Sequence, residues 1–218
     1  MKNRISYWIV FLLGFQTVLF AKVFQMKGEP ILLARGDGVA YIQPRWSPDG
    51  KQLAFTSSNY QGLWVMDMAE KNIRKITGDA AVGFGFEWSN DAQAIVSRVS
   101  RFEKFRRYNA VKLFDLATAK ARLLSDFQTK MTGLPHWSPT DEQVYLYNRN
   151  KLQLFDTGKK ARQSMQKSAD TKAYFLKDEQ PAEVDLMTRH IRVFEQLKDK
   201  QCLNLEVSPD HQKIALKF

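Results

Sequence analysis

The sequence predicts an all-β fold built from a repeated four-stranded unit, and three observations indicate it. A ten-residue pattern occurs five times, the unit is about 40 residues long, and each unit divides into short runs of strand-forming residues. The copies are WSPDGKQLAF (46–55), WSNDAQAIVS (88–97), WSPTDEQVYL (137–146), KSADTKAYFL (167–176) and VSPDHQKIAL (207–216). Their starts are 42, 49, 30 and 40 residues apart, close to the length of a β-propeller blade. We therefore expect a β-propeller of four-stranded blades.

The first unit shows how each predicted strand follows from its residues. Trp46 ends the first strand, and Ser47–Gly50 forms a turn, because proline presets φ, aspartate bonds nearby backbone and glycine tolerates positive φ. Residues 52–57 alternate and are rich in strand formers, which predicts the second strand. The segments 63–67 and 73–76 supply the third and fourth strands.

The later units repeat this order. Third strands are predicted at 111–115 and 152–156, and a fourth strand at 121–124. The fourth unit keeps a strand at 191–194 but lacks the tryptophan and the turn glycine. Lys177–Met187 is the only modest helical candidate.

The two ends of the chain predict how the propeller closes. The last unit contains only its first two strands, whereas 23–26 and 31–34 resemble a third and a fourth strand. We expect five blades closed by the two termini, with 207–218 and 22–45 sharing the last blade, because closure protects sheet edges. The alternative is a truncated part of a six- to eight-bladed ring.

The first 21 residues have the pattern of an export leader. Lys2 and Arg4 precede an uncharged run of 17 residues, Ile5–Ala21. We interpret 1–21 as a signal peptide or an uncleaved N-terminal membrane anchor, and 22–218 as the propeller domain. Either interpretation predicts a periplasmic or exported protein, in the second case tethered to the inner membrane by residues 5–21.

Composition excludes several classes of protein. Of the 218 residues, 44% are hydrophobic and 26% charged, which excludes wholesale disorder. Cys202 is the single cysteine, so an intrachain disulfide is excluded, and no Cys/His cluster has zinc spacing. The net charge of +10 favours a polyanionic partner.

The sequence shows no catalytic constellation, and we expect no enzyme activity, cofactor or metal. There is no Gly-x-Ser-x-Gly elbow and no Walker loop, and Gly83–Phe86 is interpreted as a flexible crossover between blades. One acid per repeat suggests turn stabilisation at Asp49, Asp91, Asp141 and Asp210. The repeated Trp46, Trp88 and Trp137 are expected to pack between adjacent sheets. His136, which precedes Trp137, is the candidate for a ligand contact on the channel face.

The second unit is enlarged by a basic and aromatic insertion between its second and third strands. Residues 97–108 contain five basic residues, one acid and three aromatics. The candidate partner-binding residues are Arg98, Arg101, Phe102, Lys104, Phe105, Arg106, Arg107 and Tyr108. Such a surface fits an acidic protein patch or an anionic membrane, and export argues against nucleic acid. The alternative is a solvated hairpin whose aromatic rings cover the neighbouring sheet.

The repeat resembles that of TolB-type propellers. The resemblance is carried by WSPDGKQLAFTS, by the preceding Pro44 and by a strand ending in Met66-Asp67, and it extends over 23–218 as a repeat pattern. Similar repeats occur in the propeller domains of prolyl-oligopeptidase-type serine peptidases. The TolB resemblance implies a periplasmic propeller that binds other envelope proteins. The chain departs from TolB in having no room for a separate α/β domain between Ala21 and the first blade.

Three functions are compatible with this sequence. The first is a non-enzymatic protein-binding or scaffolding module of the cell envelope. The second is the propeller part of a truncated serine peptidase. The third is a propeller that binds a sugar or another small molecule in its central channel. The sequence gives no indication of the oligomeric state.

Overall fold

The computed structural model describes residue 29 and residues 32–35, 38–159, 171–208 and 213–218. The chain divides into two compact units, Met1–Leu32 and Leu33–Phe218, and all strands assigned in these ranges belong to the second. No helix within the described ranges is long and apolar enough to cross a bilayer. The predicted leader and the strand predicted at 23–26 lie outside the described residues.

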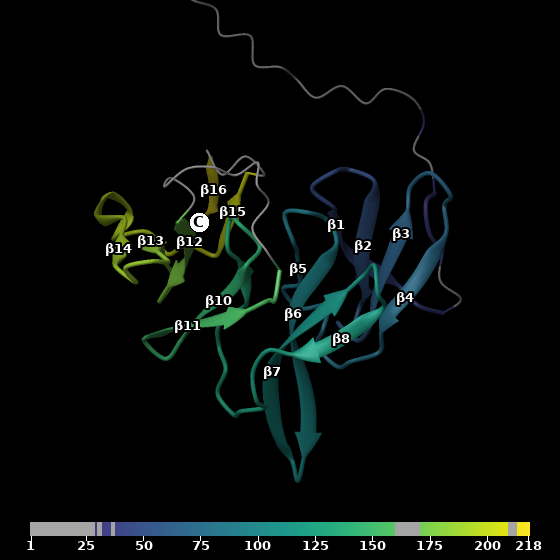
Figure 1. Cartoon of the computed structure of the whole chain (residues 1–218), viewed down its shortest axis with the longest axis horizontal. Helices are drawn as coiled ribbons and strands as arrows, with labels where there is room; N and C mark the ends of the chain where they lie inside the picture. Colours follow the sequence, from purple (N-terminus) through teal and green to yellow (C-terminus); the bar gives the residue numbers. More distant parts are fainter. Residues whose placement is uncertain (1–28, 30–31, 36–37, 160–170, 209–212) are drawn as a thin grey trace, which may run out of the picture. The chain divides into compact units, whose positions relative to one another are not determined.

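The described residues form sixteen strands in five antiparallel sheets, which we number I to V along the chain (Figure 1). Sheet I contains β1 (Tyr41–Trp46), β2 (Gln52–Ser57), β3 (Leu63–Asp67) and β4 (Ile73–Thr77). Sheet II contains β5 (Glu87–Trp88), β6 (Ala94–Glu103), β7 (Arg106–Asp115) and β8 (Lys120–Leu123). Sheet III contains β9 (His136–Trp137), β10 (Gln143–Asn148) and β11 (Lys151–Asp156). Sheet IV contains β12 (Lys172–Lys177), β13 (Gln180–Asp185) and β14 (Ile191–Val193), and sheet V contains β15 (Asn204–Val207) and β16 (Ile214–Lys217).

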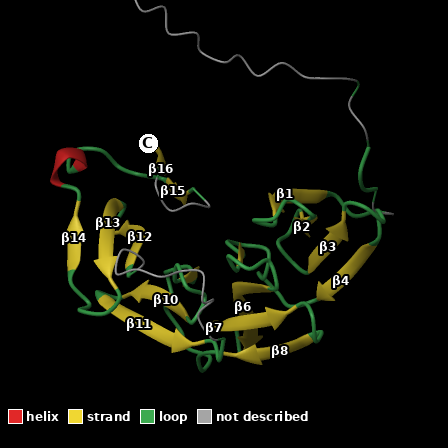
Figure 2. Ribbon diagram, turned by 45° about the horizontal axis from the view of Figure 1, so that its top comes forward, coloured by secondary structure: helices red, strands yellow, loops and turns green. Residues whose placement is uncertain are grey.

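The all-β class predicted from the repeat is confirmed. In every sheet, strands that are consecutive in sequence pair as neighbours, as in the blades of a propeller. The only helical element among the described residues is the short 3-10 helix Glu195–Leu197, drawn in red in Figure 2. The modest helix predicted at Lys177–Met187 is wrong, because Gln180–Asp185 forms β13 between two partner strands.

The turn between the first and second strands is built by a serine and an aspartate in sheets I and II. Ser47 Oγ donates to Asp49 Oδ1 over 2.6 Å, and Ser89 Oγ makes the same bond to Asp91. Each carboxylate also accepts the backbone N–H two residues further along. These bonds replace the strand hydrogen bonds that the chain loses where it reverses.

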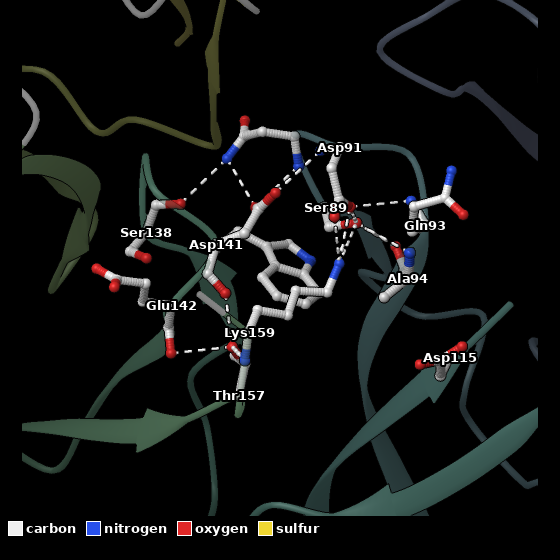
Figure 3. A network of polar contacts seen from close by, with 12 residues as sticks. Ser89, Asp91, Gln93, Ala94, Asp115, Ser138, Asp141, Glu142, Thr157 and Lys159 are labelled. Carbon is white, nitrogen blue, oxygen red and sulfur yellow. Dashed lines mark hydrogen bonds and ion pairs between the residues drawn. The ribbon is translucent and has the colours of Figure 1, made fainter. Parts of the chain in front are cut away.

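Asp141 departs from this pattern, and the prediction that it stabilises its own turn is wrong. It stands at the left-handed position, with φ of 62°, that Gly50 holds in sheet I. Its carboxylate instead accepts the backbone N–H groups of Asn90 and Asp91, each over 2.9 Å (Figure 3). Burial raises the pKa of Asp141 above its usual 3.8, against the effect of these two bonds. Asp141 therefore connects the turns of sheets II and III.

Lys159 strengthens the same connection from the far end of sheet III. Its Nζ lies 2.7 Å from Asp91 and 5.4 Å from the centre of the Trp137 ring (Figure 3). Burial opposes ionisation of Asp91, but the bonds from Lys159 and Ser89 outweigh it, so the pKa of Asp91 lies below 3.8. Asp91 therefore stabilises the fold at neutral pH, and this contribution is lost as the pH falls through its lowered pKa.

Adjacent sheets pack face to face through apolar side chains. One core joins sheets I and II around Val65, Phe86 and Ile95, and another joins sheets II and III around Val111 and Val144. A third core joins sheets III and IV. Burial of these faces is the main favourable term in folding, and it requires each sheet to have a neighbour.

The tryptophans add a repeated hydrogen bond to this packing. The Trp88 indole N–H donates to the carbonyl of Arg45, and Trp137 donates to the carbonyl of Glu87, both over 3.1 Å. The two acceptors occupy the same place in the repeat: Arg45 immediately precedes Trp46, and Glu87 immediately precedes Trp88. Each tryptophan therefore bonds to the repeat before its own. Both rings are buried, as predicted, whereas Trp46 is 54% exposed, so the packing prediction is wrong for the first repeat.

The crossover at Gly83–Phe86 is packed rather than flexible. Val82 and Phe86 are fully buried, and Gly83 lies against the side chain of Thr56. A Cβ atom at Gly83 would lie 1.9 Å from Thr56 Oγ1, a separation that no side chain accepts. Phe84, between the two glycines, is left 43% exposed.

Candidate functional site

The hairpin of β6 and β7 extends well beyond the other strands of sheet II (Figure 1). Both strands have ten residues, whereas no strand in the other four sheets has more than six among the described residues. The base is held on both sides, because the backbone N–H of Ser100 donates to the carbonyl of Ala80, and Asn109 pairs with Gln128. The predicted insertion is therefore a continuous extension of two paired strands.

The tip of the hairpin is a two-residue turn of strained residues. Lys104 and Phe105 link the paired Glu103 and Arg106 and have φ values of 44° and 64°. Positive φ at both central positions is typical of a type I′ turn, which favours asparagine and glycine. A phenylalanine in this conformation is unusual, and its ring is fully exposed.

Cationic side chains surround the exposed rings of the hairpin. Arg101 pairs with Glu103 over 3.2 Å and lies 4.4 Å from the centre of the Phe127 ring. Lys104 and Arg106 are exposed, and Phe102 is 67% exposed. Exposed cations beside uncovered aromatic rings have the chemistry to contact anionic groups.

The remaining predicted residues of the hairpin occupy its base. Arg107 donates through Nε to Ser100 Oγ and Asn109 Oδ1, and Tyr108 lies 5.8 Å from the guanidinium of Arg101. Arg98 is only 8% exposed, and its Nη1 donates to the three carbonyls of 131–133. The structure thus places Arg98 beneath the surface that the other predicted residues present.

His136, the channel-face candidate, lies in a separate cavity of about 500 Å³. Its Nδ1 is 2.9 Å from Glu87 Oε2, and its ring lies 5.4 Å from that of Tyr145. Tyr145 donates its hydroxyl to the carbonyl of Tyr174, and burial raises its pKa well above 10. The cavity is lined by residues from all five sheets, and neither Arg98 nor the hairpin tip reaches it.

The residues around His136 show a pattern that sequence reasoning missed. Arg45, Glu87, His136 and Glu206 each precede the first residue of a repeat. They form two contacts between sheets: Glu87 hydrogen-bonds with His136, and Arg45 forms an ion pair with Glu206 over 3.6 Å. The alternation of acidic and basic residues at one repeat position is the signal that could have identified them. The exposed Trp46 lines the same cavity.

No group of three His, Cys, Asp or Glu side chains within the described ranges is arranged to hold a metal ion. Cys202, the single cysteine of the chain, is buried.

Comparison with solved structures gives similarity of fold. The tricorn protease matches 81% of this chain with a TM-score of 0.56 at 10% identity, and a prolyl endopeptidase matches 78% with a TM-score of 0.52 at 13% identity. TolB from Acinetobacter baumannii matches 71% with a TM-score of 0.44 at 15% identity. The chain spans 24%, 31% and 43% of those three chains, respectively.

The first two of these matches, with TM-scores above 0.5, support a propeller-type fold. No protein-family model and no curated protein matches the sequence.

Proposed function

We propose that this chain is an exported, non-enzymatic propeller module that binds an acidic protein of the cell envelope through the β6–β7 hairpin. The observation that carries the proposal is the tip, where Phe105 is fully exposed in a left-handed backbone conformation between Lys104 and Arg106. Strained residues persist where the surrounding structure holds them, and they cluster at sites of function. An exposed aromatic ring flanked by cations provides an anchor and a charged rim for an interface.

An acidic protein fits this surface better than an anionic membrane. Polybasic segments that hold proteins on membranes usually contain about four to eight clustered cations. Here Arg101 is paired with Glu103, and Arg107 uses its Nε within the hairpin. The planar guanidinium of arginine matches the geometry of a carboxylate, which favours acidic side chains as the partner groups.

The test is capture from envelope extract by the purified full chain and by a charge-reversed hairpin. The variant carries Arg101→Glu, Lys104→Glu and Arg106→Glu. The control reverses three exposed lysines outside the hairpin, by K51E, K120E and K151E, so that both variants have the same net charge.

We expect the hairpin variant alone to lose a salt-sensitive partner that the parent chain and the control retain. Equal capture by all three proteins would refute the proposal. Loss of binding to phosphatidylglycerol vesicles, with protein capture unchanged, would identify a membrane surface instead.

Export and closure of the blades belong to the same proposal. The leader-like pattern at 1–21 supports export, and the Arg45–Glu206 ion pair between sheets I and V supports a last blade adjoining the first. The intact mass of the protein from the envelope fraction tests both. We expect 25.3 kDa less residues 1–21; 25.3 kDa itself would indicate a retained anchor, and a larger mass would refute five-blade closure.

A second candidate function is binding of a small polar ligand, such as a sugar, in the cavity at His136. The exposed face of Trp46 and the Glu87–His136 pair provide a stacking surface and hydrogen-bonding groups in one cavity. Saturation-transfer NMR with a neutral hexose and a hexuronate tests it. Signals that persist unchanged in Trp46→Ala would refute it.

A further inference from the structure

A cavity of about 460 Å³ lies at the base of the β6–β7 hairpin, apart from both the tip and the cavity at His136. Its walls come from three segments: the turn between β2 and β3, the crossover between β4 and β5, and the hairpin itself. Tyr60, Phe84 and Phe102 contribute aromatic rings, and Arg98 and Arg107 contribute two guanidinium groups. None of its lining residues is acidic.

Arg98 is a buried cation for which the described residues provide no carboxylate. Its Nη1 donates to backbone carbonyls, and its guanidinium lies 5.5 Å from the centre of the Phe84 ring. Its Nε is buried, and no described group accepts a hydrogen bond from it. Glu103, the one acidic residue of 97–108, lies at the hairpin tip and pairs with Arg101. Buried charges are normally paired, so this arrangement leaves a negative charge to be supplied by a ligand.

Arg107 adds a second positive charge to the same cavity. It lines the cavity together with Arg98. Burial lowers the pKa of Arg98, and the charge of Arg107 lowers it further. Two guanidinium groups of like charge repel each other, and an anion between them removes that repulsion. The aromatic rings provide apolar surface beside the charges, and Tyr60 and Phe84 are held edge to face at 5.5 Å.

We propose that this cavity binds an organic carboxylate with an aromatic or branched apolar body. A carboxylate matches the fork of an arginine, and the three aromatic rings among the lining residues suit an apolar body beside it. A free phosphate is a poorer fit, because it needs many donors and gains nothing from the rings. The proposal does not depend on the protein contact at the hairpin tip.

The test measures binding of two carboxylates by the full chain, using isothermal titration calorimetry. The first is 3-phenylpropionate, a free acid, and the second is N-acetyl-Ala-Phe, which represents the carboxyl terminus of a polypeptide. Neutral counterparts are 3-phenylpropanol and N-acetyl-Ala-Phe-amide. The acid that binds more tightly identifies the source of the carboxylate, and each neutral counterpart is expected to bind at least ten-fold more weakly.

Adjacent arginines provide a matched pair of variants. Arg107→Gln removes a charge from the cavity and keeps a donor for the hairpin base, whereas Arg106→Gln removes the same charge from a residue that does not line the cavity. We expect R107Q to weaken carboxylate binding about ten-fold and R106Q to change it less than two-fold. Phe84→Leu, which leaves both arginines in place, is expected to weaken it about five-fold.

Three results would overturn the proposal: no binding of either acid, equal binding of acid and neutral counterpart, or equal losses in R107Q and R106Q. The tip variant Lys104→Asn/Phe105→Gly separates this site from the proposed function. It is expected to bind the acid normally while losing the protein partner. If it captures protein like the parent chain, the proposed function fails and the carboxylate site stands.

Discussion

Substitution of Gly83 by alanine is expected to destabilise the fold strongly, because the crossover leaves no space for a side chain. The added Cβ would lie 1.9 Å from Thr56 Oγ1, 2.3 Å from its Cβ and 2.6 Å from its Cγ2. Thr56 cannot move without cost, since it is fully buried and its hydroxyl donates to the carbonyl of Gly62 over 2.7 Å. The crossover must therefore shift, or this hydrogen bond must break.

The magnitude follows from these two contributions. Overpacking of a well-packed site costs about 1–3 kcal/mol, and a broken buried hydrogen bond costs about 1 kcal/mol more. We expect Gly83→Ala to lower the free energy of unfolding by about 2–4 kcal/mol, which lowers Tm by roughly 4–16 °C in a domain of this size. Differential scanning calorimetry and urea unfolding measure both quantities.

Gly78 provides the matched control. An added Cβ there would meet only the flexible end of Lys75, at 3.6 Å, and Gly78 does not need a positive φ. Gly78→Ala is therefore expected to change stability by less than about 1 kcal/mol. If both variants unfold at the temperature of the parent chain, the close contact between the crossover and Thr56 is refuted.

Three further substitutions test other parts of the structure. Lys159→Met is expected to lower the free energy of unfolding by about 1–2 kcal/mol at pH 7, because Asp91 loses its cation. This loss should shrink below pH 3.8 as Asp91 is protonated, and urea unfolding at pH 7 and pH 3 measures it. Lys104→Asn/Phe105→Gly should raise stability by about 1–2 kcal/mol, since both residues suit the positive φ values of the tip, and an unchanged or lower Tm would contradict the strain. Trp88→Phe should cost about 1–2 kcal/mol through the unpaired carbonyl in β1, and equal unfolding midpoints would show that this bond is unimportant.

Much of the fold follows from the sequence because turns and alternation are local properties. The second strand predicted at 52–57 coincides with β2, and the third strands predicted at 111–115 and 152–156 lie within β7 and β11, respectively. The turn residues Ser47 and Asp49 do what their chemistry predicts. Period-two patterns and turn residues constrain the chain within a few residues, so one sequence is enough to identify them.

What the sequence did not predict depends on contacts between sheets. Asp141 looks like the other turn acids, but it lies one position later in its repeat, and only the fold brings it to Asn90 in the preceding sheet. The Glu87–His136 pair likewise joins residues 49 positions apart. The burial of Arg98 depends on the segment 131–133, which no local pattern connects to the hairpin.

The regular pairing of β6 with β7 has a consequence for protein engineering. From Ala94↔Asp115 to Glu103↔Arg106 the two strands pair without a bulge, so side chains alternate strictly between the two faces. Removing or inserting two residues on each strand preserves this alternation, and the two-residue turn then joins a pair of strand residues in the same geometry as Glu103 and Arg106. The hairpin can therefore be shortened or lengthened in such steps while the cores below it remain intact. It is a natural position for grafting foreign recognition loops.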